Sequence, residues 1–313
     1  MVRAFARAAL VDIVSRLPAG ARRAVLERWA ARDDAYSLFQ SVGRLYGIRD
    51  IRVTGEYGLI EGSIEDDAIL ATYARSKCWA DGSNTLFERY FADHRAGTYI
   101  DIGANIGLTT IPVARNPRVA CKAFEPEPVN FGYLRSNIER NCRHGNVELF
   151  NLALFSVGTT LSFELSERNR GDHRIRLDEG DGDFGEGDRT VISVRAERLD
   201  DVLDATALVG PIAAKIDTQG AESQVFAGGR AILGAAELIA FEFWPYGLAR
   251  MEGDVGFLVE FFEHNFAVAA MLHGDRNEPP VWQPIATVAA KLAEKAAQDG
   301  RSPYAYYDVL ARK

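Results

Sequence analysis

Cysteine is scarce in this chain, which disfavours a sulfur-based scaffold. The 313 residues include three cysteines, Cys78, Cys121 and Cys142, and no two of them have Cys-x-x-Cys spacing. An odd number at these positions argues against both a disulfide framework and a zinc-knuckle site. The sequence therefore predicts a protein of a reducing compartment, the cytoplasm.

Long apolar runs and an excess of positive charge are also lacking. No stretch approaches the about 18 apolar residues that a membrane-spanning helix requires, and the apolar run from Ala8 to Val11 is too short for a signal peptide. The net charge of −8, from 36 basic and 44 acidic residues, disfavours general binding to nucleic-acid backbones. With 47% hydrophobic and 26% charged residues, the composition is that of a globular protein.

The charge is unevenly distributed, because residues 1–32 contain seven arginines and two acidic residues. Residues 3–17 and 21–32 are predicted to form two helices. They suit either a cap packed on the main domain or a basic amphipathic surface that contacts an acidic partner or the inner face of a membrane. We keep both alternatives.

The middle of the chain alternates short β-rich runs with helical segments, after a hairpin predicted at 50–62 and helices within 65–92. This alternation predicts an α/β protein with a parallel sheet and helices on both faces. The candidate strands are 98–102, 119–125, 147–152, 212–217, 237–243 and 266–272, with further β-like runs at 159–165 and 190–195. Between the last two lies the insert 178–188, with six acids and four glycines. Its spacing does not match a calcium loop, so we expect a solvated, flexible loop.

A glycine loop follows the first of these strands. Asp101 ends the apolar strand, and Gly103, Ala104, Asn105 and Gly107 lead into a helix. Glycine permits a tight turn and close approach of a ligand. The pattern is neither a Walker loop nor a good dinucleotide fingerprint, and a carboxylate beside it does not suit a pyrophosphate. It does suit S-adenosylmethionine, which has a sulfonium and an ammonium group and no phosphate.

Two further strand ends complete a candidate cofactor site. Glu125, followed by Pro126, comes 24 residues after Asp101, near the distance at which an acid binds ribose hydroxyls in related sheets. The alternative is that Glu125 caps the next helix. Asn151 and the backbone near Ala153 end the third strand, where they can meet the adenine edge.

The candidate catalytic groups are His173, Asp217 and Glu242. Asp217 and Glu242 end two apolar strands, and a buried carboxylate there needs a partner. His173 lies in a polar loop, and its ordinary pKa of about 6.5 suits a base at neutral pH. Glu222 suits a helix start and a site role equally. The three catalytic candidates could also bind Mg²⁺, an alternative that the sequence disfavours, so no metal site is predicted.

Taken together, these segments resemble the FkbM-type methyltransferases, a branch of the S-adenosylmethionine-dependent methyltransferases. The resemblance spans about residues 97–244. The segments that carry it are YIDIGANIGLTT, AFEPEPVNFGYLRSNI, NVELFNLAL, RLDDVL and KIDTQGAESQVFAGGRAIL. This chain has Thr218-Gln219 where the family commonly has Val-Glu, which removes a charge beside the site.

The resemblance implies a Rossmann-like, doubly wound seven-stranded sheet. It would be mostly parallel, with an antiparallel last strand supplied by 304–310. We expect a helical extension over 1–95 and the methyltransferase domain over 96–313. The resemblance implies that Asp101, Gly103, Asn105, Gly107, Glu125, Ala153 and Asp217 serve the methyl donor.

The usual acceptor of the family is a hydroxyl of a sugar or natural product. We expect a neutral hydroxylated acceptor here, unless the arginines at 168, 170, 174 and 176 face the pocket. The alternatives are a nicotinamide-dependent oxidoreductase on the same sheet and a non-catalytic donor-binding scaffold.

Overall fold

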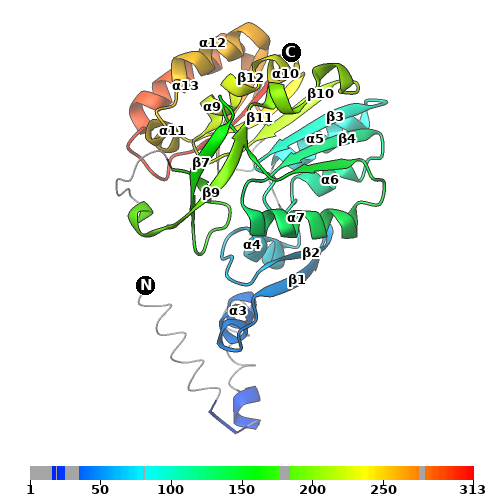
Figure 1. Cartoon of the computed structure of the whole chain (residues 1–313), viewed down its shortest axis with the longest axis vertical. Coiled ribbons are helices and arrows are strands. Elements are labelled where there is room, and N and C mark those ends of the chain that lie inside the picture. The colour runs from blue at the N-terminus through cyan, green and yellow to red at the C-terminus, as the bar shows by residue number, and fades with distance from the viewer. Residues whose placement is uncertain (1–15, 19, 25–34, 80–81, 177–183, 275–278) are drawn as a thin grey trace. The chain divides into compact units, whose positions relative to one another are not determined.

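The chain divides into two compact units. The computed structural model describes residues 16–18, 20–24, 35–79, 82–176, 184–274 and 279–313, and Figure 1 labels their helices and strands. The smaller unit comprises residues 1–78 with 167–170, and the larger comprises 79–166 with 171–313. Most of the helices predicted at 3–17 and 21–32 lies outside the described residues. No helix within the described ranges has the length and apolar character needed to cross a membrane.

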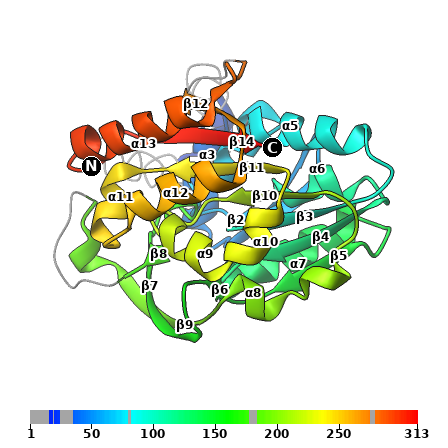
Figure 2. The ribbon, with the colours of Figure 1, turned by 90° about the horizontal axis from the view of Figure 1, so that it is seen from above.

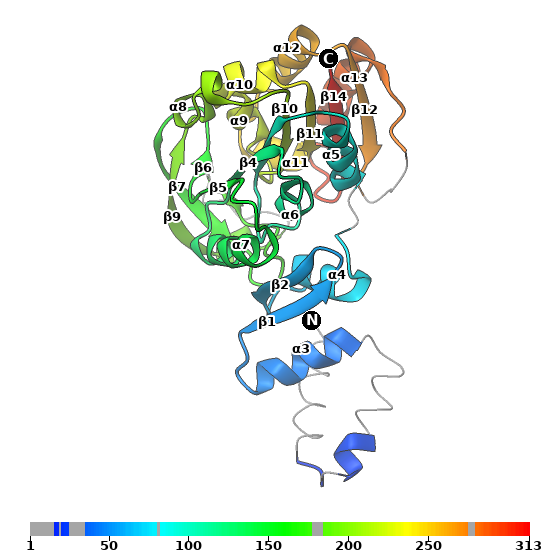
Figure 3. The same cartoon turned by 90° about the vertical axis from the view of Figure 1, so that its right-hand side faces the viewer.

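The smaller unit contains the expected hairpin, whose strands β1 (Asp50–Gly55) and β2 (Gly58–Ser63) pair antiparallel. The helices α3 (Ala35–Leu45) and α4 (Ile69–Ser76) accompany it, and α4 lies beside β1 (Figure 3). The Tyr73 hydroxyl accepts a hydrogen bond from the Tyr57 N–H and donates one to the Gly58 carbonyl, both at 3.0 Å. This buried hydroxyl therefore joins α4 to the turn of the hairpin.

The larger unit is built on an eight-stranded mixed sheet, in the order β13-β12-β14-β11-β10-β3-β4-β5. The strands from β11 to β5 are parallel, whereas β14 is antiparallel to both of its neighbours. The strands are β3 (Gly97–Ile102), β4 (Val119–Phe124), β5 (Val147–Phe150), β10 (Ile212–Ile216), β11 (Leu238–Phe243), β12 (Val268–His273), β13 (Gln283–Pro284) and β14 (Tyr307–Arg312).

The α/β class is confirmed, but the prediction of seven strands with one antiparallel strand is wrong. The eighth strand, β13, pairs antiparallel with β12 through two residues. Two residues carry no alternating pattern, and one of them is Pro284, which a sheet tolerates at an edge. The antiparallel strand predicted at 304–310 begins three residues later, at Tyr307.

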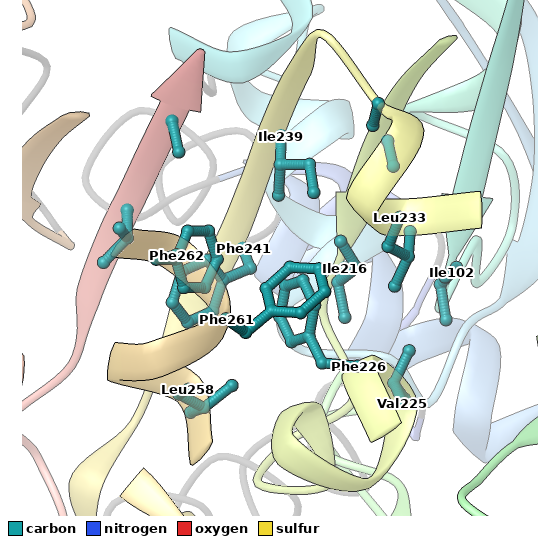
Figure 4. Close-up of a cluster of buried hydrophobic side chains, with 14 of the residues drawn as sticks. Ile102, Ile216, Val225, Phe226, Leu233, Ile239, Phe241, Leu258, Phe261 and Phe262 are labelled. Atoms are coloured by element: carbon teal, nitrogen blue, oxygen red, sulfur yellow. The ribbon is translucent and has the colours of Figure 1, made fainter. Parts of the chain in front are cut away.

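Helices cover both faces of this sheet, and the alternation of side chains along β3 shows how. Ile100 and Ile102 belong to the core under α9, α10 and α12, which also contains Phe226 and Phe262 (Figures 2 and 4). Tyr99 points to the other face, where its ring lies 4.9 Å from that of Phe87 in α5. The helices are α5 (Gly82–Ala92), α6 (Thr110–Ala114), α7 (Pro128–Asn141), α8 (Leu199–Val202), α9 (Glu222–Gly228), α10 (Arg230–Ala235), α11 (Pro245–Arg250), α12 (Val255–Asn265) and α13 (Ile285–Asp299).

The helix α5 lies with the larger unit, whereas the helical extension predicted over 1–95 includes residues 82–92. Phe87 and Phe91 of α5 both contact the Tyr99 ring of β3, at 4.9 and 6.3 Å. All three side chains are almost completely buried. Burial of aromatic rings against the central sheet accounts for this division of the chain.

A second sheet of four strands, in the order β6-β9-β7-β8, follows β5 in the chain. The β-like runs predicted at 159–165 and 190–195 are confirmed as strands, and they pair with each other. Phe163, Ile175 and Val194 of this sheet pack with Met251, at the end of α11. The strands are β6 (Ala153–Leu154), β7 (Thr159–Leu165), β8 (Arg174–Ile175) and β9 (Thr190–Glu197).

The acidic insert was expected to be solvated, and at Glu186 this expectation is wrong. Residues 178–183 lie outside the described residues, whereas Glu186–Asp188 form a short 3-10 helix in which the Glu186 side chain is completely buried. Its Oε1 lies 3.4 Å from the Arg174 guanidinium and 3.8 Å from that of Arg250, and the Tyr246 hydroxyl donates to it at 3.4 Å. A carboxylate is buried when cations and donors replace its water.

Candidate active site

The glycine loop after β3 is held close to two neighbouring strands. The Gly103 and Ala104 N–H groups donate to the Phe124 carbonyl at 3.1 and 2.9 Å. Gly103 has φ +83°, and a Cβ there would lie 1.9 Å from the Asp217 carbonyl oxygen. Only glycine permits this approach, so the loop bends at the end of β3 directly against the end of β10.

The Asp101 side chain connects the start of this loop to its end. The residue is completely buried, and its Oδ2 accepts hydrogen bonds from the Thr109 and Thr110 hydroxyls at 2.7 and 2.6 Å. Both threonines stand at the start of α6. Asp101 therefore fixes the two ends of the loop relative to each other, a positioning role that the sequence did not reveal.

Glu125 lies at the end of β4 with its carboxylate facing the glycine loop. Its Oε2 accepts from the Asn105 N–H and its Oε1 from the Glu127 N–H, both at 2.9 Å. The alternative role of capping α7 belongs instead to Glu127, which accepts from the Val129 and Asn130 N–H groups at 2.9 and 2.7 Å. Glu125 therefore joins the end of β4 to the glycine loop, the position at which an acid binds ribose hydroxyls in related sheets.

The two candidates for the adenine side, Asn151 and Ala153, differ in exposure. The Asn151 side chain donates to the Glu125 and Pro126 carbonyls at 2.9 and 3.1 Å, and the residue is exposed. Ala153 is buried in β6. Asn151 therefore holds the chain around Glu125 in place.

Asp217 and Glu242 are brought together by Gln219. The Gln219 amide nitrogen donates to Asp217 Oδ1 and to Glu242 Oε2, each at 2.8 Å. On the other side, the Lys215 ammonium lies 3.1 Å from Asp217 Oδ2. An amide can donate to two carboxylates at once, whereas a glutamate at position 219 would add a third negative charge.

Glu222 holds the turn between β10 and α9. It is completely buried, and its Oε1 accepts from the Thr218 N–H and hydroxyl, both at 2.9 Å, while both oxygens lie near the Gly220 N–H. Burial raises the pKa of Glu222 to about 7, and the negative charge of Asp217 adds to the rise. Glu222 thus stabilises the loop that carries Asp217 and Gln219.

The pKa of Glu242 is raised as well. Burial raises its pKa well above the ordinary value, and the charges of Asp217, Glu222 and Asp308 raise it further, while Lys215 opposes them. A carboxyl with a raised pKa is a stronger base when ionised and can accept a proton nearer neutral pH. Raised carboxyl pKa values cluster at functional sites.

His173, the third catalytic candidate, is positioned by the four-stranded sheet. Its Nδ1 accepts a hydrogen bond from the Ser166 N–H at 2.9 Å, and its ring meets that of Phe163 edge-on at 6.4 Å. Asp217 and Glu242, in contrast, are joined at the eight-stranded sheet. Since Nδ1 is an acceptor, the proton of neutral His173 lies on Nε2. Its catalytic role stays a prediction.

A small pocket, with room for about one water molecule, lies beside Gln219. Its lining includes Glu164, Arg174, Arg176 and Arg250. Arg250 was not predicted from the sequence, because it follows Asp217 by more than thirty residues, in α11, and belongs to no motif. The sequence feature that could have indicated Arg250 is its position at the end of a short helix, directly after the strand that carries Glu242.

Within the part of the chain that the structure describes, no group of three or more His, Cys, Asp or Glu side chains is arranged to bind a metal ion.

Comparison with known families decides the assignment. The profile of the methyltransferase FkbM domain matches residues 101–266, slightly more than half of the chain. The chain belongs to the FkbM methyltransferase family. The matched segment of this FkbM domain runs from Asp101 through Phe266 and so includes every predicted site residue, as well as Gln219 and Arg250.

Other comparisons are more distant. No curated protein matches this FkbM-domain chain. Among solved structures, the O-methyltransferase TomG from Streptomyces achromogenes, in complex with SAM, is 12% identical, with 80% of this chain and 87% of that chain covered and a TM-score of 0.40. An O-methyltransferase from Bacillus cereus, in complex with SAH, is 14% identical, with 78% and 88% covered and a TM-score of 0.39.

Proposed function

We propose that this FkbM-family protein transfers a methyl group from S-adenosylmethionine to a hydroxyl of a sugar, glycan or natural product. The observation that carries the donor assignment is the Glu125 carboxylate. Its Oε2 accepts from the Asn105 N–H of the glycine loop and its Oε1 from the Glu127 N–H, while Glu127 caps the first turn of α7. A carboxylate so placed, at the end of a strand in a doubly wound sheet, suits ribose hydroxyls.

The surrounding residues fit such a donor. Gly103, Asn105 and Gly107 have φ values of +83°, +51° and +94°, so the loop turns tightly between β3 and α6. Asp217 and Glu242 supply negative charge near the loop, which suits the ammonium and sulfonium groups. When bound, the donor supplies an electrophilic methyl group.

One carboxylate of the pair Asp217 and Glu242 would accept the hydroxyl proton of the acceptor. As the acceptor oxygen bonds to the methyl carbon and the carbon–sulfur bond breaks, the hydroxyl proton must pass to a base. We assign this step to Glu242 or Asp217, whose carboxylates each accept a hydrogen bond from the Gln219 amide nitrogen at 2.8 Å. Alignment of the oxygen with the methyl group supplies much of the rate, and the rigid Gln219 contact favours that alignment.

A direct test measures release of S-adenosylhomocysteine over a panel of sugars, glycans and hydroxylated natural products. We expect turnover with a hydroxyl acceptor, and we expect it to survive exhaustive treatment with EDTA, since positioned carboxylates replace a metal in this scheme. Loss of turnover with EDTA, restored by Mg²⁺, would contradict the metal-free mechanism. Binding of NADH without binding of S-adenosylhomocysteine would contradict the donor assignment.

A further inference from the structure

The two carboxylates joined by Gln219 differ in how many of their oxygens face a donor. Asp217 Oδ1 accepts from the Gln219 amide nitrogen at 2.8 Å, and Asp217 Oδ2 lies 3.1 Å from the Lys215 ammonium. Glu242 accepts from the same amide through Oε2, also at 2.8 Å. Among the residues that the structure describes, no donor contacts Glu242 Oε1. Both oxygens of Asp217 are therefore engaged, whereas Glu242 keeps one oxygen that can receive a proton.

Lys215 brings a positive charge to this carboxylate from within the central sheet. The residue is buried in β10 and pairs in register with Ala240 of β11, two residues before Glu242. Side chains two residues apart in an extended chain lie on the same face. Lys215, Asp217 and Glu242 therefore share one face of the sheet at the ends of two adjacent strands. A buried ammonium is tolerated when it faces a carboxylate, and Asp217 is that carboxylate.

The backbone on either side of Gln219 holds its amide between the two acids. Gln219 has φ +56°, in the left-handed region, which is costly for a residue other than glycine. Glu222 accepts hydrogen bonds from the N–H groups of both neighbours, Thr218 at 2.9 Å and Gly220 at 3.1 Å. Such costly conformations persist where the surrounding structure fixes them, and they cluster at active sites. The turn therefore gives the bridging amide a fixed place.

Glu242 is surrounded by charged groups on neighbouring elements. Its pKa is raised mainly by burial and further by three carboxylates, those of Asp217 after β10, Glu222 in α9 and Asp308 in β14. Lys215 acts in the opposite direction and lowers the pKa of Glu242. Lys215 therefore limits the rise and helps Glu242 to ionise, which a base must do before it can accept a proton.

We propose that Lys215 is a positioning residue that fixes Asp217 as the permanent anion of the pair, so that Glu242, through Oε1, is the base that accepts the proton of the acceptor. This inference rests on the proposed function and deepens it, because it gives the two carboxylates different roles. As the acceptor oxygen bonds to the methyl carbon, the carbon–sulfur bond breaks and its electron pair stays on sulfur. The hydroxyl proton passes to Glu242 Oε1 and from there to water.

The first measurement follows the titration of Glu242 and needs no acceptor. The protein is labelled with ¹³C at the glutamate side-chain carboxyl, and the Glu242 signal is assigned by its absence in Glu242→Gln. In Lys215→Met the midpoint of this signal should move upward by about one pH unit, because a positive charge is lost, whereas Lys215→Arg should stay near the wild type. Lys291→Met, at an exposed position of α13, is the control and should change nothing.

The second measurement is the pH–rate profile with an acceptor that supports S-adenosylhomocysteine release. Glu242→Gln should lower kcat by about 100-fold or more at every pH, with little change in donor affinity. Asp217→Asn should retain more turnover, and the acid limb of its profile should move to lower pH, because a charge that raises the pKa of Glu242 is lost. Lys215→Met should move the acid limb to higher pH, and Lys215→Arg should restore it. A purely structural role of Lys215 would not produce opposite shifts in these two variants.

Three results would overturn the proposal: the same Glu242 midpoint in the wild type and Lys215→Met, an equal shift in Lys291→Met, or a loss of turnover in Asp217→Asn as large as in Glu242→Gln. Thermal melts show which variants fold. If Lys215→Met does not fold, the downward shift in Asp217→Asn and the loss in Glu242→Gln decide the result. Failure of the wild type to bind S-adenosylhomocysteine, or to methylate any acceptor, would instead contradict the proposed function.

Discussion

The buried carboxyl of Glu222 should make the stability of the protein fall as pH rises towards neutrality. The change to test is Glu222→Gln, which keeps the shape of the side chain and an oxygen at the position of Oε1. That oxygen accepts from the Thr218 N–H, the Thr218 hydroxyl and the Gly220 N–H. The substitution therefore removes the ionisable group while it retains the hydrogen bonds that Oε1 accepts; only the second contact of the Gly220 N–H, with Oε2 at 3.1 Å, is lost.

The magnitude follows from the pKa of Glu222, which burial raises from 4.5 to about 7. The unfolded chain loses this proton near its ordinary pKa, whereas the folded protein holds it to a higher pH. Stability from this group is therefore complete below about pH 4.5 and is lost as pH rises through 7. At about 1.36 kcal/mol per pKa unit, the loss is roughly 3 kcal/mol.

The assay is urea unfolding of the wild type and Glu222→Gln at several pH values between 4.5 and 8. The variant should gain roughly 3 kcal/mol relative to the wild type across this range, since only the wild type pays to ionise a buried carboxyl. Glu260→Gln, on an exposed position of α12, should show little change. A difference between Glu222→Gln and wild type that stays constant with pH would refute the reasoning.

Three further predictions concern the loop and the base. Gly103→Ala should destabilise the protein to urea by about 3 kcal/mol or more, because a Cβ there lies 1.9 Å from the Asp217 carbonyl oxygen. Gly132→Ala, at an open position of α7, should stabilise it by about 0.5–1 kcal/mol in the same urea unfolding. Gln219→Glu should reduce turnover at pH 7 by about tenfold and move the acid limb of the pH–rate profile upward, because another carboxylate raises the pKa of the base; an unchanged profile would count against the carboxylate pair. His173→Ala should lower turnover far more than donor affinity, and unchanged turnover would remove His173 from the mechanism.

Strands with a long apolar pattern could be predicted from the sequence, and so could the residues at their ends. The apolar strands have carboxyl ends that meet at one edge of the sheet. Their sequences therefore allowed us to predict the site residues at these ends, Asp101, Glu125 and Asp217. The two-residue strand β13 has no such pattern, and pairing with β12 alone defines it.

Partners that are distant in the chain could not be predicted. The burial of Glu186 depends on Arg174 and Arg250, which lie on different elements, so its local sequence of acids and glycines indicated a solvated loop. The choice between Glu125 and Glu127 as the cap of α7 could not be predicted for a different reason, because it depends on local backbone geometry that residue types alone do not reveal.

The most direct test of the donor assignment is calorimetric titration of S-adenosylhomocysteine into the wild type, Glu125→Ala and Glu148→Ala. Glu148 is an exposed acid on the neighbouring strand β5 and serves as the control. We predict that the wild type and Glu148→Ala bind. Glu125→Ala should lose about 1.5–3 kcal/mol, or about 10- to 150-fold in affinity, because charged hydrogen bonds to the ribose are removed. Wild-type affinity in Glu125→Ala would contradict the assignment of this site to the methyl donor.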